Sequence, residues 1–177
     1  GARGGRCKGR RSQAGGGRGG GAAGLTVKGH VLELGGQDPL IVLSDADLDY
    51  AVDAAAFGAF LHQGQICMSA RRIIVEQPIA DAFIDALTRK TAGLKVGDPN
   101  AMDTIIGPLI NPAALEMVGR RVDAAVAGGA KVLTVGSAVG ACHPPTCATP
   151  LPAGSPLERM DTFGPRAPIA AGPVATR

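Results

Sequence analysis

A cysteine and a glutamate of this chain are each of a type and in a setting that could carry chemistry. Cys67 closes the stretch Gln63-Gly64-Gln65-Ile66-Cys67, where a thiol follows a glycine-containing turn. The thiolate is a strong nucleophile, but only a few per cent of a free cysteine is ionised at neutral pH without activation. Cys67 is therefore a candidate nucleophile. A buried, inert thiol explains this residue equally well when it is considered alone.

Glu33 lies between two leucines and just before Gly35-Gly36, at the end of an apolar run. Removing a carboxylate from water raises its pKa, which suits it to act as a general base near pH 7. Glu33 is therefore a candidate base. Taken alone, an exposed carboxylate on a turn is the simpler explanation of the residue.

Strands and helices are predicted to alternate around these two residues. Asp45 or Asp47 can cap a helix that runs to about His62, and Asn111 with Pro112 can open another. Short apolar runs separated by such helices are typical of an α/β protein with a largely parallel sheet. The expected strands are 31–34, 40–43, 72–76 and 131–135, and the expected helices are 45–62, 78–93 and 112–127.

The composition changes near residue 25. Residues 1–24 contain eleven glycines and six basic residues, so we expect this segment to be disordered, because it has little to bury against its ordering entropy. An aberrant translation product, such as a shifted reading frame, would also explain it. Residues 25–165 form the predicted globular part, and residues 166–177 are expected to be an irregular tail.

Charge and composition exclude several classes of protein. The net charge of +3 comes from the first 24 residues, and the remainder is mildly acidic, so no global basic surface indicates nucleic-acid binding. No apolar run is long enough to span a membrane, and no secretory signal is recognisable. We therefore expect a soluble, cytoplasmic protein. Cys142 and Cys147 flank His143 and two prolines, a spacing that does not suit zinc, so no metal site is predicted.

Several motifs in a fixed order resemble the NAD(P)-dependent aldehyde dehydrogenase superfamily. They include the segments around Glu33 and Cys67 at the spacing usual in that family. The segments 37–39 and 62–69 are most similar to the branch that oxidises aromatic aldehydes such as vanillin, benzaldehyde and salicylaldehyde. The matching segments are 32–36, 46–49, 64–67, 94–99, 106–111, 129–130, 145–146 and 162–165.

The resemblance implies a mechanism and a cofactor. The Cys67 thiolate would attack an aldehyde, hydride would leave to NAD or NADP, and Glu33 would activate the water that hydrolyses the thioester. The Cys67 backbone N–H would contribute to the oxyanion hole. Asp161 stands where the family has a glutamate that binds the nicotinamide ribose, and Phe163 matches a residue near the nicotinamide. The carboxylate of Asp161 is one methylene shorter.

The resemblance also bears on what the chain can do alone. Residues 25–165 correspond to part of the family's catalytic domain, and the cofactor domain and oligomerising segments of the homo-oligomeric family members are not recognisable. We therefore expect weak NAD(P) binding and little dehydrogenase activity from the isolated chain. Two alternatives stay open. One is a non-catalytic fragment or assembly module, and the other is an RNA-associating protein with a Gly/Arg-rich tail.

Overall fold

The computed structural model of the chain describes residues 7–10, 13–133 and 136–173. The chain forms two compact units, Gly1–Gly36 and Gln37–Arg177. The boundary therefore lies between Gly36 and Gln37, twelve residues beyond the predicted change at residue 24. Glu33 belongs to the first unit and Cys67 belongs to the second.

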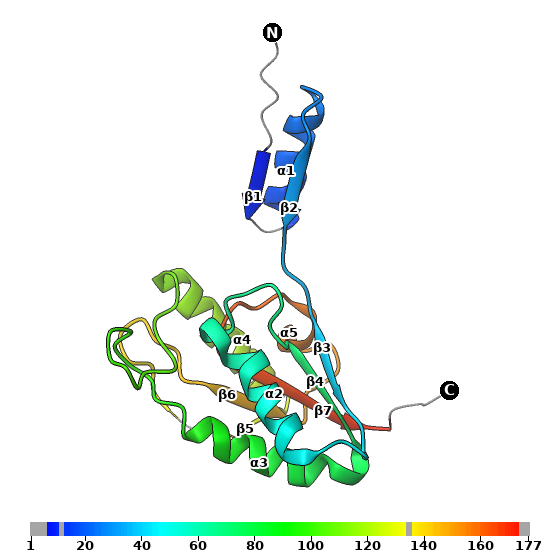
Figure 1. Cartoon of the computed structure of the whole chain (residues 1–177), viewed down its shortest axis with the longest axis vertical. Helices are drawn as coiled ribbons and strands as arrows, with labels where there is room; N and C mark the ends of the chain where they lie inside the picture. Colours follow the sequence, from blue (N-terminus) through cyan, green and yellow to red (C-terminus); the bar gives the residue numbers. More distant parts are fainter. Residues whose placement is uncertain (1–6, 11–12, 134–135, 174–177) are drawn as a thin grey trace. The chain divides into compact units, whose positions relative to one another are not determined.

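The first unit is a strand–helix–strand arrangement (Figure 1). Strand β1 (Cys7–Arg10) pairs in parallel with β2 (His30–Glu33), and helix α1 (Gln13–Gly24) connects them. This corrects our expectation of disorder for residues 7–10 and 13–24, while residues 1–6 and 11–12 lie outside the described ranges. The physical reason lies in the partners: β2 supplies backbone hydrogen bonds to β1. Gly16 also lets α1 lie close to Leu34, since a Cβ atom on Gly16 would lie 3.0 Å from the Leu34 side chain.

The second unit is built on a five-stranded sheet with the order β3-β4-β7-β6-β5. All neighbours are parallel except β5, which runs antiparallel to β6. The predicted α/β architecture with a largely parallel sheet is confirmed. The strands are β3 (Pro39–Val42), β4 (Arg72–Glu76), β5 (Lys131–Val132), β6 (Thr146–Thr149) and β7 (Arg166–Gly172).

Strand β7 corrects the expected irregular tail over residues 166–172, because it lies at the centre of the sheet. A proline inside a run of small residues hides the strand signal. Pro168 is tolerated because the pairing partner of β7 changes directly after it. Residues 166–168 pair with β6, and residues 169–172 pair with β4. Residues 174–177 of the predicted tail lie outside the described part of the chain.

Helices α2 and α4 begin at the capping residues that the sequence predicts. The Asp47 side chain accepts a hydrogen bond from the Tyr50 N–H at the start of α2, and Asn111 does the same for the Ala114 N–H at the start of α4. No helix in the described ranges is long and apolar enough to cross a membrane. The helices are α2 (Leu48–Phe60), η1 (Leu61–Gly64), η2 (Gln77–Ile79), α3 (Ala80–Ala92), α4 (Pro112–Ala127) and α5 (Pro156–Arg159).

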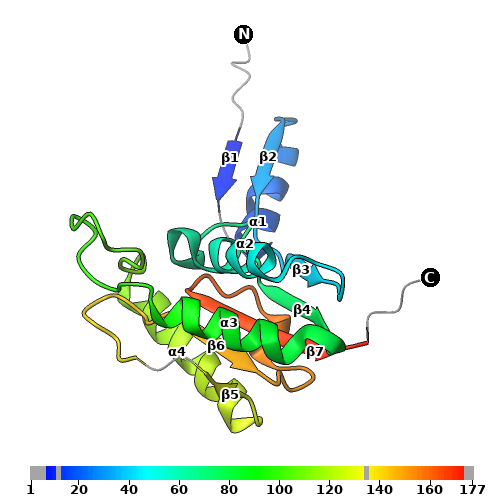
Figure 2. The ribbon, with the colours of Figure 1, turned by 60° about the horizontal axis from the view of Figure 1, so that its bottom comes forward.

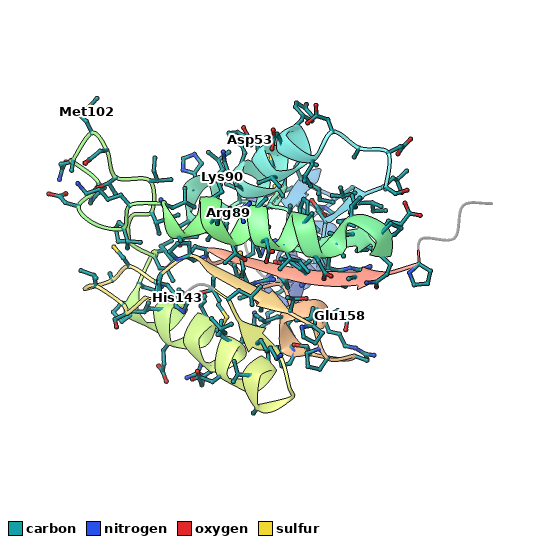
Figure 3. All side chains as sticks on the ribbon, turned by 90° about the horizontal axis from the view of Figure 1, so that it is seen from below. Asp53, Arg89, Lys90, Met102, His143 and Glu158 are labelled. Atoms are coloured by element: carbon teal, nitrogen blue, oxygen red, sulfur yellow. The ribbon has the colours of Figure 1, made fainter. Side chains whose placement is uncertain are left out.

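The helices cover both faces of the sheet (Figure 2). Helices α2 and α3 bury the larger core, against residues such as Ile73 and Ile169, and Lys90 of α3 lies 2.5 Å from Asp53 of α2 (Figure 3). Helices α4 and α5 bury a smaller cluster that contains Ala125 and Leu157. Alternate residues of β6 and β7 therefore face different helices, as the pleat of a strand requires.

Candidate active site

Cys67 lies on a tight turn between η1 and β4. The Ser69 N–H donates to the Ile66 carbonyl at 3.3 Å, which closes a four-residue turn with Cys67 in its middle. The Cys67 side chain is exposed, whereas Cys142 and Cys147 are buried. An exposed thiol on a fixed turn is open to a substrate, which the two buried thiols are not.

The backbone before Cys67 is strained. His62, Gln63 and Gly64 follow one another with φ of 50°, 57° and 65°, so three successive residues occupy the left-handed region. Residues with a Cβ atom disfavour this region by about 1–2 kcal/mol each. Such strain persists only where surrounding contacts impose it, and it concentrates at functional sites. Three sets of contacts hold this loop in its strained conformation.

The first of these contacts joins two glycines. A Cβ atom on Gly64 would lie 2.2 Å from the carbonyl oxygen of Gly164, so the position accepts no side chain. Gly164 immediately follows Phe163, one of the predicted cofactor-binding residues. The loop before Cys67 therefore packs backbone to backbone against the segment 161–164.

The second contact comes from two glutamines, which bind the loop 107–110. The Gln65 Oε1 accepts a hydrogen bond from the Ile110 N–H at 2.9 Å. With its amide oriented to satisfy both partners, Gln63 accepts from the Gly107 N–H and donates to the His62 carbonyl, each at 3.1 Å. Two motifs that are about 45 residues apart in the sequence are thus joined through backbone amides.

The third contact is Arg71, which is almost fully buried and lies behind the Cys67 turn. One guanidinium nitrogen, Nη2, donates to the Ile66 carbonyl at 2.5 Å. The other, Nη1, donates to the Thr162 carbonyl at 2.8 Å and lies 2.7 Å from Asp161 Oδ1. The guanidinium carbon stands 4.1 Å from the centre of the Phe163 ring, within the range of a cation–π contact. Burial lowers the pKa of Arg71, and Asp161, Asp38 and Cys67 oppose that shift.

Two further arginines hold the segment that carries Asp161. Arg121 of α4 donates to the Asp161 carbonyl at 2.8 Å and to the Thr162 hydroxyl at 2.7 Å. Arg166 of β7 donates to the Thr162 carbonyl at 3.2 Å, and burial, together with Arg71 and Arg121, lowers its pKa to about 9. Asp161 itself is about a third exposed, with a side-chain accessibility of 34%. Its carboxylate thus faces Arg71 and remains open to solvent on another side.

The structure brings three of the four predicted site residues together. Arg71 binds the turn of Cys67 and also contacts both Asp161 and Phe163. Glu33 is the last residue of β2 in the other unit, where its backbone pairs with Arg10, so its pairing with Cys67 stays a prediction. Sequence reasoning missed Arg71 and Gln65. In the sequence, the one feature that marks Arg71 is its place as a charged residue directly before the apolar strand β4.

The segment that contains Cys142 and Cys147 is largely buried. His143 is buried, its Nδ1 lies 2.8 Å from the Pro144 carbonyl, and burial lowers its pKa (Figure 3). The Cys147 thiol donates to the Thr91 hydroxyl at 3.4 Å, and burial raises its pKa to about 11. Among the residues that the structure describes, no group of three or more His, Cys, Asp or Glu side chains could hold a metal ion.

Comparison with known proteins identifies the family. The model of the aldehyde dehydrogenase family matches residues 12–171. The chain is 43% identical over 146 residues to a vanillin dehydrogenase of Pseudomonas fluorescens, which is 82% of this chain and 30% of that protein.

Solved structures agree with this match. A salicylaldehyde dehydrogenase from Pseudomonas putida G7, complexed with salicylaldehyde, superposes with a TM-score of 0.89 at 40% identity, over 96% of this chain and 35% of that one. A glyceraldehyde-3-phosphate dehydrogenase from Methanocaldococcus jannaschii, complexed with NADP, superposes with a TM-score of 0.89 at 36% identity, over 95% and 36%. The chain thus spans about a third of the length of these relatives. It belongs to the aldehyde dehydrogenase family.

Proposed function

We propose that this chain carries the nucleophile of an aldehyde oxidation and that Cys67 is that nucleophile. The observation that carries the proposal is the exposed Cys67 thiol on a turn that buried Arg71 fixes, directly after a strained loop that the Gly64–Gly164 contact holds. A protein maintains such strain where geometry matters for function. Membership of the aldehyde dehydrogenase family supports the same chemistry.

The proposed reaction divides one oxidation into two easier steps. The Cys67 thiolate bonds to the aldehyde carbon and gives the anion of a thiohemiacetal, and loss of hydride from that carbon re-forms the carbonyl and leaves a thioester on Cys67. Glu33 takes a proton from water, whose oxygen attacks the thioester carbon. The carbon–sulfur bond then breaks, which releases the carboxylic acid and restores the thiolate. A nicotinamide cofactor, when bound, accepts the hydride.

Asp161 and Phe163 are the residues proposed to hold the nicotinamide end of that cofactor. The fit rests on the carboxylate of Asp161, which is partly exposed and is joined through Arg71 to the Cys67 turn. A partly exposed carboxylate accepts hydrogen bonds from ribose hydroxyls. Aspartate reaches one methylene less far than glutamate, so Asp161→Glu should tighten binding of the cofactor. The choice between NAD and NADP is not assigned to any residue of this chain.

The substrate proposed for this site is an apolar aldehyde, with aromatic aldehydes as the leading class. Met68 follows Cys67 within the turn, Leu61 begins η1 six residues before Cys67, and both are exposed. Exposed apolar residues beside a nucleophile favour an apolar substrate over a charged one. The names of the vanillin and salicylaldehyde dehydrogenases among the relatives support the aromatic class.

The proposal is tested by acylation of the thiol with p-nitrophenyl acetate, followed by mass spectrometry of the intact chain and of its peptides. This step needs the nucleophile but no cofactor. We expect an acetyl group on the peptide that contains Cys67, and none on that peptide after Cys67→Ser. Cys142→Ser is the matched control and should leave the rate unchanged, because Cys142 is buried.

The same measurement separates the leading proposal from a second one, in which the chain is a non-catalytic assembly module. Acetylation of Cys67 at the rate of a short cysteine peptide would favour the module. Glu33→Gln should leave acetylation intact and slow release of the acetyl group, since the proposed base acts only on the second step. Steady oxidation of benzaldehyde with NAD by the purified chain would overturn our expectation that the isolated chain has little dehydrogenase activity.

A further inference from the structure

The peptide bond between Ile66 and Cys67 is held from one side. Its carbonyl oxygen, on Ile66, accepts from Arg71 Nη2 at 2.5 Å and from the Ser69 N–H at 3.3 Å. The bond is trans, and in a planar trans peptide the carbonyl and the following N–H point in opposite directions. Fixing the Ile66 carbonyl toward buried Arg71 therefore fixes the Cys67 N–H toward the other side.

The Cys67 N–H is the donor that this arrangement leaves available. Within the ranges that the structure describes, no backbone or side-chain acceptor binds it. Cys67 itself is exposed, whereas Arg71 behind the turn is buried. The N–H and the thiol thus belong to one residue on the open side of the turn, where a carbonyl oxygen attacked by the thiol would develop negative charge.

We propose that Arg71 is a positioning residue that orients the Ile66–Cys67 peptide so that the Cys67 N–H can stabilise that developing oxyanion. The inference rests on the proposed function, because it takes Cys67 as the nucleophile. Preorganised backbone donors contribute strongly to acyl transfer, since they need no reorientation during the reaction. Arg71 does not contact the substrate in this role, and it acts through the peptide that it holds.

An arginine is required because the guanidinium binds two places at once. Nη2 binds the Ile66 carbonyl, while Nη1 binds the Thr162 carbonyl and pairs with Asp161. The Phe163 ring contacts the guanidinium and limits its rotation. A lysine keeps the charge but offers a single ammonium group, which cannot reproduce this planar fork. Arg71→Lys therefore separates the charge of the residue from its geometry.

Two reactions of Cys67 differ in their need for an oxyanion donor. Acylation by p-nitrophenyl acetate passes through a tetrahedral oxyanion, which the Cys67 N–H can stabilise. Alkylation by iodoacetamide is a direct displacement at carbon and forms no oxyanion. A change confined to the peptide orientation should therefore affect acylation and leave alkylation nearly unchanged. Collapse of the loop or of the fold should change both reactions.

The experiment measures both second-order rate constants at Cys67 in the full chain, at fixed pH. For Arg71→Lys we expect acylation to slow at least about tenfold, and alkylation to stay within about twofold. Arg120→Lys is the matched control. Arg120 of α4 is exposed, pairs with Glu116 and contacts neither the Cys67 turn nor the segment 161–164, so both rates should be retained.

Asp161→Asn is a second variant with little change of volume. It removes the ionic partner of Arg71 and should slow acylation by a smaller factor without slowing alkylation. If Arg71→Lys fails to fold, Asp161→Asn tests whether Arg71 orients the Ile66–Cys67 peptide. Equal acylation rates in the unchanged chain and the folded variants would overturn this inference but leave the proposed function of Cys67 standing. A parallel fall of both rates would also overturn it. Absence of Cys67 acylation in the unchanged chain would remove the proposed function and this inference with it.

Discussion

Gly64 and Gly164 approach so closely that a Cβ atom on Gly64 would lie 2.2 Å from the Gly164 carbonyl oxygen. Gly164 is equally confined on its other side, where an added Cβ would lie 2.5 Å from Cγ2 of Val118 in α4. The loop before Cys67, the segment after Phe163 and helix α4 are thus stacked with no room for a side chain between them. The position of the thiol depends on two glycines 100 residues apart.

Gly64→Ala should therefore disrupt both stability and chemistry. The added methyl meets backbone, which cannot move aside as a flexible side chain would, and φ of 65° is unfavourable for alanine. We expect the free energy of unfolding in urea to fall by about 3 kcal/mol or more, and Cys67 acylation to fall with it. Gly119→Ala is the control. Gly119 lies within α4 with open space around it, so alanine should stabilise the helix by about 0.5–1 kcal/mol. Equal effects of the two variants would contradict the close contact.

Gln65→Ala should loosen the loop 107–110 without unfolding the protein. The Gln65 Oε1 accepts from the Ile110 N–H at 2.9 Å, and its loss returns that amide to water. Hydrogen exchange of the Ile110 amide should become faster, while the free energy of unfolding falls by only about 1 kcal/mol. Gln77→Ala, at an exposed glutamine in η2, should leave the Ile110 amide unchanged. Unaltered exchange in Gln65→Ala would show that another group protects this amide.

Local pattern was sufficient to predict most of the second unit. Apolar runs identified β3 and β4, and the capping residues Asp47 and Asn111 located the starts of α2 and α4. Strand β7 could not be predicted in this way, because Pro168 and small residues give it no strand pattern and its pairing with β4 and β6 is non-local. In the first unit, the predicted strand 31–34 corresponds to β2, whereas β1 and α1 were missed, because β1 exists through its pairing with β2.

The site was predictable only where its residues share a short motif. Cys67 was found from its own neighbourhood and from the resemblance to the family. Arg71 was not found, because its role depends on the Thr162 carbonyl, 91 positions away along the chain. An arginine next to an apolar strand has no distinguishing pattern until the fold places a carboxylate and a ring around it. The pairing of Glu33 with Cys67 stays a prediction, as these residues belong to different units.

Cys147 should make the stability of the fold fall at alkaline pH. Burial raises the pKa of this thiol to about 11, from an ordinary value of 9.0. Between these values the unfolded chain has lost the proton that the folded chain retains, so rising pH favours unfolding. The stabilisation from keeping this thiol neutral is constant below about pH 9 and is lost progressively as the pH rises toward 11, by about 3 kcal/mol. Urea unfolding at pH 8, 9.5 and 10.5 measures it. Cys147→Ala should be less stable at pH 8 and should lack this part of the slope, whereas Cys67→Ala should retain it. An identical slope in the two variants would assign the effect to other groups.

Arg166→Lys should cost far more stability than the same exchange at Arg120, and the comparison isolates the geometry of a buried guanidinium. Arg166 is buried and donates to the carbonyls of Thr162, Leu157 and Arg71 at 3.2, 3.1 and 3.4 Å. A single ammonium group cannot reach all three, and each carbonyl left without a donor in the interior is unfavourable. We expect the free energy of unfolding to fall by about 2–4 kcal/mol.

Arg120 of α4 is exposed and pairs with Glu116 one helical turn before it, so Arg120→Lys should change stability by about 0.5 kcal/mol or less. The Arg166 variant should also slow acylation of Cys67, because the Thr162 carbonyl that Arg166 fixes is the one that Arg71 binds. If Arg166→Lys lowers the stability but leaves Cys67 acylation unchanged, Arg166 supports the fold and not the site. Arg71 alone would then hold the Cys67 turn in position.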